Sequence, residues 1–172
     1  MRIVVSPHNV VNYPPGGGHF WVYAQYVDGL QRIGCDVWWL EEFRRSGDAK
    51  EEAARVAILK ERLQRLGMGE RIILYTEDQT FVNCTASQAR KVFRDTDLLL
   101  NFHQRMDARM LEQFRLTALV DIDPGLLQYW ISSGLLSPAP HDLYFTTGET
   151  VGKPGANFPD CGLRWLQIRP PV

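Results

Sequence analysis

Short apolar runs alternate along the chain with longer segments in which apolar residues recur every three or four positions. The short runs predict buried strands, because a strand that is covered on both faces is apolar throughout. The predicted strands are Ile3–Ser6, Asp36–Glu41, Arg71–Glu77, Asp97–His103, Thr117–Asp123, Asp142–Glu149 and Leu163–Ile168.

The segments between these strands have the spacing of amphipathic helices. In the first helical segment, Phe20, Tyr23, Val27 and Leu30 fall on one face, and Gly34 offers a stop. The second helix carries its apolar stripe on Val56, Leu59, Leu63 and Leu66.

Polar residues indicate where the later helices begin. Asp48 can cap the second helix, with Glu51 at the reciprocal position of a capping box. Thr85 predicts the start of a short helix that runs to Phe93. The last two predicted helices are Asp107–Phe114 and Leu126–Ser133.

This alternation predicts an α/β fold in which residues 1–172 form a single Rossmann-like domain. We expect one parallel sheet of six or seven strands with helices on both faces and Ile3–Ser6 at or near its centre. The stretch from Gly152 to Gly162 is rich in turn residues and predicts a surface loop.

Charge and composition exclude several classes of function. The 172 residues include 19 basic and 20 acidic ones, without a basic stripe, which argues against binding of nucleic acid through its phosphates. No apolar stretch approaches the ~20 residues of a membrane span, and the first residues do not resemble a signal peptide. The three cysteines form no CxxC pair, which favours a reducing compartment. We therefore expect a cytoplasmic protein.

Ligands of parallel sheets bind beyond the carboxyl ends of the strands, and polar residues gather there in this sequence. The candidate substrate-binding residues are Gly16, Gly17, Gly18, Trp21, His103, Asp123, Thr147, Gly148 and Glu149. A metal site built from His8, His19, His103 and Asp121 has no supporting ligand spacing, and no cofactor is expected.

The turn "PPGGGHFW" stands where the first strand passes into the first helix. Gly16 to Gly18 would let the backbone approach a ligand, and the helix start offers unpaired N–H groups. The turn matches neither GxGxxG nor the P-loop, so nucleotide binding by those motifs has little support.

His19 ends this turn and is the candidate catalytic base, because a neutral imidazole can accept a proton from a hydroxyl group near pH 7. Asp121 is the best candidate for a carboxylate partner. Two alternatives remain open: His19 is only a helix-start residue bonded to a backbone carbonyl, and Asp121 and Asp123 are a helix cap and a turn carboxylate. Trp21 either packs in the core or an interface, or stacks on an acceptor ring.

The strand, the glycine turn, the histidine that opens the first helix and the closing "PPV" resemble the N-terminal domain of GT-B glycosyltransferases. The stretches "LVDIDPGLLQYW", "HDLYFTTGETVG" and "GLRWLQIRPPV" are similar in particular to bacterial family-1-type glycosyltransferases. The resemblance implies that His19 deprotonates the acceptor hydroxyl. The inverting plant-type members orient this histidine with an aspartate at the end of the fourth strand, where this chain reads "NFHQ", so Asn101, His103 or Asp121 would have to replace it.

The resemblance also implies a second domain that holds the nucleotide sugar, and the chain stops at "RPPV", where the linker to that domain would begin. We therefore expect the acceptor-binding half of a glycosyltransferase, inactive alone, whose nucleotide-sugar donor comes through a missing second domain or chain. The alternative is a non-catalytic Rossmann-like module that binds a small ligand or a protein.

Overall fold

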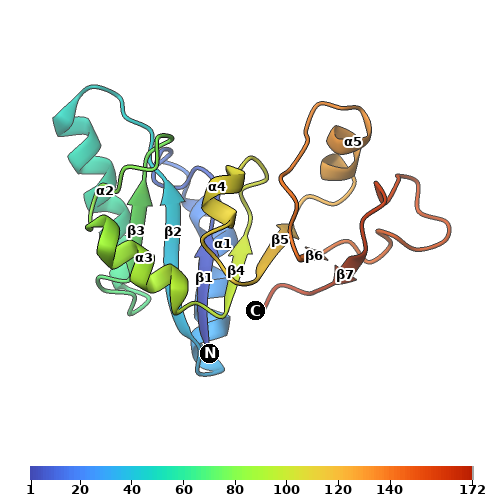
Figure 1. Ribbon diagram of the computed structural model, residues 1–172, viewed down its shortest axis with the longest axis horizontal. Coiled ribbons are helices and arrows are strands. Elements are labelled where there is room, and N and C mark those ends of the chain that lie inside the picture. Colours follow the sequence, from blue (N-terminus) through green and yellow to red (C-terminus); the bar gives the residue numbers. More distant parts are fainter. Residues whose placement is uncertain (172) are drawn as a thin grey trace.

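One parallel sheet forms the centre of the computed structural model, which describes residues 1–171 (Figure 1). Its strands are β1 (Arg2–Ser6), β2 (Asp36–Glu42), β3 (Ile72–Tyr75), β4 (Leu98–Asn101), β5 (Thr117–Asp121), β6 (Leu143–Thr146) and β7 (Trp165–Gln167). They are hydrogen-bonded in the order β3-β2-β1-β4-β5-β6-β7. The α/β fold class, the parallel sheet of six or seven strands and the position of β1 near its centre are thus confirmed, and the sheet has seven strands.

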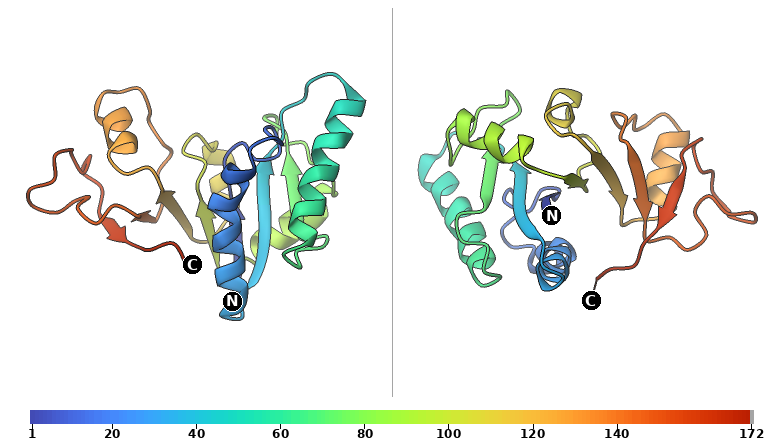
Figure 2. Two further views of the ribbon diagram at one scale, coloured as in Figure 1. Left: turned by 180° about the vertical axis from the view of Figure 1, so that it is seen from behind. Right: turned by 60° about the horizontal axis from the view of Figure 1, so that its bottom comes forward.

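Helices cover both faces of the sheet, as predicted (Figure 2). The helices are α1 (Gly17–Arg32), α2 (Ala49–Gln64), α3 (Ala86–Arg94), α4 (Ala108–Leu111) and α5 (Leu126–Ser132). Helices α1 and α2 pack on one face in a cluster that includes Val5 and Leu100, and α3 and α4 pack on the other face with Val4 and Leu99. Helix α5 packs separately against β5–β7.

The helix starts follow the predicted caps with one correction. The Asp48 carboxylate accepts hydrogen bonds from the backbone N–H groups of Lys50 and Glu51. The capping box predicted with Glu51 does not form, because the Glu51 carboxylate instead lies 3.4 Å from Arg55 one turn further along. A complete capping box occurs at Thr85, whose partner is Gln88.

Several predicted elements are shorter than expected, and at the ends of β4 and β6 a side chain turns the backbone away from the sheet. The Asn101 side chain bonds to both the N–H and the carbonyl of His103, and this tight turn ends β4 at Asn101. The Thr146 hydroxyl accepts a hydrogen bond from the Gly148 N–H and ends β6 in the same way. The predicted helix Asp107–Phe114 is reduced to the single turn of α4.

The chain beyond β7 returns to α1, where Pro171 lies against Gly29. A Cβ atom on Gly29 would stand 2.4 Å from the Pro171 ring, so this crossing requires glycine at position 29. Within residues 1–171, no helix has the length and the apolar character to cross a bilayer.

Candidate functional site

The strand order reverses between β1 and β4, and at such a point the loops after the strands diverge and leave a crevice. A cleft of about 660 Å³ lies there. It is lined from α1, α5 and the loops after β1, β4 and β5 by residues that include His8, His19, Tyr23, Arg105, Asp123 and Trp130. Of the residues proposed from the sequence, His19 and Asp123 therefore line the same cavity.

His19 lies in the first turn of α1 and is half-buried. Its Nε2 atom is 2.5 Å from the carbonyl oxygen of His8, and its ring stands edge-on to Tyr23 at 5.2 Å between centroids. A carbonyl oxygen only accepts hydrogen bonds, so Nε2 carries the proton and Nδ1 is the nitrogen that can accept one. His19 thus makes the hydrogen bond to a backbone carbonyl that is expected of a residue that only begins the helix. The same bond leaves Nδ1 free to act as a base.

Asp121 is completely buried, and both of its carboxylate oxygens are engaged. Oδ2 accepts hydrogen bonds from Gln128 Nε2 at 2.9 Å and from Thr146 Oγ1 at 2.8 Å. Oδ1 accepts one from the N–H of Asp123 at 3.0 Å. The carboxylate joins β5 to α5 and β6, and among residues 1–171 no hydrogen bond connects it to His19. The structure does not bring this predicted pair together.

Asn101 and His103 form a second buried polar group, at the end of β4. The Asn101 amide holds the His103 backbone and lies 3.0 Å from Nε2 of His141. The His103 ring packs against the His8 ring at a tilt of 38°, with 4.7 Å between the centroids. Asn101 therefore fixes the loop that carries His103 and makes no hydrogen bond to His19.

Burial and neighbouring cations keep the His8 and His103 rings neutral at pH 7. Burial is the main cause that lowers the pKa of His103 to about 4, and His8, Arg44 and Arg105 lower it further. The pKa of His8 is lowered by burial first and then by Arg44, His19 and Arg105. Both arginines are thus within electrostatic reach of both rings.

The remaining predicted residues lie outside this cleft. Trp21 is exposed on α1 and lines a separate depression with Gly17 and Arg62. Gly148 is enclosed by Pro124 and Val151, and a Cβ atom there would approach them to about 2.5 Å. Close packing therefore explains why this position is a glycine. Glu149 is exposed and lies 3.6 Å from Arg169.

The other loop residues of the predicted set have local contacts. The Thr147 N–H donates to the carbonyl of Asp121 and continues the edge of the sheet. Gly18, like Gly17, is exposed in the first turn of α1, where a Cβ atom would meet nothing within 4 Å. Gly16 caps the helix against the ring of Tyr13.

Glu41 is a functional candidate that the sequence analysis did not identify. It is fully buried at the end of β2, where it accepts hydrogen bonds from the Val11 N–H at 2.7 Å and from Trp39 Nε1 at 2.9 Å. Loss of solvation raises the pKa of its carboxyl group to about 8. Glu41 thereby fixes the loop after β1, which supplies the carbonyl that holds His19. An acidic residue in the apolar run "VWWLEE" is the signal that could have identified it.

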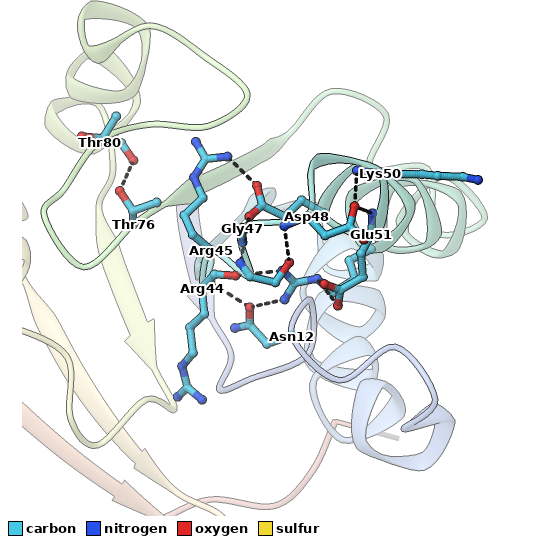
Figure 3. Close-up of polar contacts among 12 residues, drawn as sticks. Asn12, Arg44, Arg45, Gly47, Asp48, Lys50, Glu51, Thr76 and Thr80 are labelled. Atoms are coloured by element: carbon cyan, nitrogen blue, oxygen red, sulfur yellow. Dashed lines mark hydrogen bonds and ion pairs between the residues drawn. The ribbon is translucent and has the colours of Figure 1, made fainter.

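Arg44 is the second candidate that was missed, in the loop after β2. Its N–H donates to Asn12 Oδ1 at 2.9 Å, and its carbonyl accepts from Arg55 Nη2 at 2.8 Å. These bonds fix the backbone, while the Arg44 side chain extends away from the network (Figure 3). Its neighbour Arg45 is paired with Glu52. Arg44 also lines a second cavity of about 700 Å³ beyond β2 and β3.

Within the described part of the chain, no three side chains of the metal-binding types are grouped so that they could hold an ion. Comparisons with family models, curated proteins and solved structures found no match to the chain.

Proposed function

We propose that this chain is the acceptor-binding half of a glycosyltransferase and that His19 is its catalytic base. The observation that carries the proposal is the position of His19: it lines the cleft at the carboxyl edge of the sheet, with Nε2 held by the His8 carbonyl. This hydrogen bond selects the tautomer in which Nδ1 is unprotonated. The Rossmann-like sheet and the sequence resemblance to GT-B enzymes support the assignment.

The proposed reaction transfers a sugar from a nucleotide sugar to a hydroxyl group of the acceptor. The acceptor oxygen bonds to the anomeric carbon while its proton passes to Nδ1 of His19. The bond between that carbon and the nucleoside diphosphate breaks, and the diphosphate leaves with the electron pair. A second domain or chain supplies the nucleotide sugar, and the His8 carbonyl orients the ring throughout.

One observation favours a second candidate function, non-catalytic binding of a small ligand. Among residues 1–171, no carboxylate accepts a hydrogen bond from His19, and a neutral carbonyl stabilises an imidazolium less than a carboxylate does. In that case the cleft binds its ligand, and His19 serves only to begin α1.

Replacing His19 by alanine in the full-length product of the gene, assayed with its donor-binding region or partner, distinguishes the two functions. General-base catalysis contributes roughly 10²–10⁴ in rate, so we expect kcat to fall by about that factor. The acceptor KM should change little, because the loss falls on the transition state.

His141→Gln is the matched control, because this half-buried imidazole lies beside Asn101 and does not line the cleft. It should retain its turnover. If His19→Ala also keeps turnover near that of the wild type, the base assignment is wrong and the binding module is the better description.

A further inference from the structure

Two arginines from different loops lie near the His8–His103 pair. Arg44 comes from the loop after β2 and Arg105 from the loop after β4, and both lie close enough to affect the charge of both rings. Arg105 lines the same cleft as His8 and His19. The cluster of His8, His103, Arg44 and Arg105 is therefore a concentration of donors with positive charge at the strand-order reversal.

The two guanidinium groups are poorly compensated by carboxylates. The nearest carboxylate oxygen to Arg44 belongs to Glu42 and is 3.9 Å from Nε. Arg105 donates to the neutral carbonyl of Leu135 at 3.3 Å, and within residues 1–171 it forms no ion pair. In contrast, Arg45 is paired with Glu52 at 2.8 Å. Arg44 and Arg105 thus retain donors for an anion.

Two carboxylates lie near the cluster and balance the two arginines at pH 7. Asp123 lines the cleft from the loop after β5, and Glu42 lies beside Arg44. Glu41 is buried beneath the loop after β1, and burial keeps its pKa high enough for the carboxyl group to be largely protonated at pH 7. Net positive charge therefore arises at the cluster as His8 and His103 take up protons, and His19 is a third imidazole that faces His8 in the cleft.

We propose that His8, His103, Arg44 and Arg105 bind an anionic group of the ligand, a phosphate or a group of the same shape and charge. Guanidinium groups donate to the oxygens of such a group in pairs, and the imidazoles add N–H donors once they are protonated. That the anionic group belongs to the acceptor rests on the proposed function. That the cleft binds an anion does not, and binding of a simple anion tests it without sugar transfer.

The charge of the imidazoles makes the binding depend on pH. An anion beside His8 and His103 favours their protonated forms, so binding takes up protons and strengthens as the pH falls. Sulfate is a suitable probe, because it remains a dianion between pH 5.5 and 7.5. We expect its Kd to fall as the pH is lowered, with most of the change below pH 6.5, because the pKa values of both imidazoles are lowered in the free protein.

The decisive experiment is a sulfate titration of this chain, followed by the NMR signals of the histidine ring protons. We expect the signals of His8 and His103 to shift with saturation, whereas that of His141 stays in place. In Arg44→Gln and Arg105→Gln the Kd should rise about fivefold to tenfold for each substitution. Arg90→Gln, which changes an exposed arginine on α3, is the matched control and should bind sulfate as the wild type does.

Methyl phosphate and a nucleoside diphosphate distinguish the two sources of the anionic group. Competition by either compound for the sulfate site supports the proposal, and the tighter competitor assigns the group to the acceptor or to the donor. The proposal is overturned if sulfate leaves the His8 and His103 signals unshifted, or if the arginine variants bind it as tightly as Arg90→Gln. Either result leaves the role of His19 in turnover untouched, so failure of the two proposals can be told apart.

Discussion

The carboxyl ends of β1 and β4 differ from those of β5 and β6, although both places bury polar side chains at the edge of the same sheet. At β5 and β6, both oxygens of Asp121 are occupied by protein donors. At β1 and β4, the His8 and His103 rings pack against each other at a tilt, and His19 keeps its Nδ1 atom available. Complete hydrogen bonding of a buried group indicates a structural role, whereas remaining capacity beside a cleft indicates binding.

Each place also contains one buried carboxyl group, and the two differ in what surrounds them. The hydrogen bonds of the Asp121 carboxylate connect β5 to α5 and β6. Glu41 lies under the loop after β1, where desolvation is the dominant influence and raises the pKa of the carboxyl group to about 8. A substitution at Asp121 should therefore lower stability through lost hydrogen bonds, and one at Glu41 should change the pH dependence of stability.

The largest expected effect is that of Asp121→Ala on the free energy of unfolding. The substitution leaves the Gln128 amide, the Thr146 hydroxyl and the Asp123 N–H without their acceptor. Each buried donor left without a partner costs about 1–3 kcal/mol, and the costs are not additive, so we expect a loss of about 3 kcal/mol or more in urea denaturation. Asp123→Ala, at an exposed position two residues on, should stay within about 0.5 kcal/mol of the wild type. Equal losses in both variants would contradict the structural role of Asp121.

Glu41→Gln should have a smaller effect that is specific to alkaline pH. The carboxyl group has an ordinary pKa of 4.5 and a pKa of about 8 in the folded protein, so between these values the folded state binds more protons than the unfolded state. The free energy of unfolding therefore decreases as the pH rises, by about 1–2 kcal/mol from pH 6.5 to 8. Glutamine resembles the protonated acid and should remove this decrease.

The difference between the wild type and Glu41→Gln isolates Glu41 from the histidines. The fold lowers the pKa values of His8, His103 and His141, so these residues add a slope of the opposite sign in both proteins alike. Glu112→Gln, at an exposed carboxyl group, should retain the slope of the wild type. If the slopes of wild type and Glu41→Gln are the same, Glu41 is ionised in the folded protein at pH 7.

The fold could be predicted from the sequence because its signals are local. Apolar runs and caps such as Thr85 report what each segment does, and the parallel sheet follows from their alternation. Segment ends were less accurate, because the turns that close β4 and β6 depend on the side chains of Asn101 and Thr146. Their hydrogen bonds cannot be inferred from hydrophobic periodicity.

The site was predicted less well, because its geometry depends on contacts between distant segments. His19 and Asp123 do line one cleft, since both follow strands of the same edge. The pairing of His19 with Asp121 failed to appear because Asp121 points its oxygens at Gln128 and Thr146. Arg44 was missed because nothing in "FRRSG" indicates that one of the two arginines is paired and the other extends from the network.

The smallest expected effects concern the glycines at the start of α1. Neither Gly17 nor Gly18 has a positive φ, and a Cβ atom on either would meet nothing within 4 Å. Alanine is favoured over glycine in a helix by ~1 kcal/mol and restricts the unfolded chain, so Gly17→Ala and Gly18→Ala should each increase the free energy of unfolding by about 0.5–1 kcal/mol. Gly16→Ala is the contrasting variant, because its Cβ would lie 2.5 Å from the Tyr13 ring, and it should lower stability.

The same variants test whether these glycines serve the ligand. Since the fold gives Gly17 and Gly18 no packing reason to be glycine, a role in ligand binding predicts that their alanine variants are more stable yet bind the ligand more weakly. Sulfate affinity measured beside urea denaturation gives both quantities on one preparation. Weaker binding in a stabilised variant would extend the binding site from the His8–His103 pair to the first turn of α1. Unchanged binding would limit the binding site to the four side chains of the cluster. The glycine turn would then serve only to begin the helix.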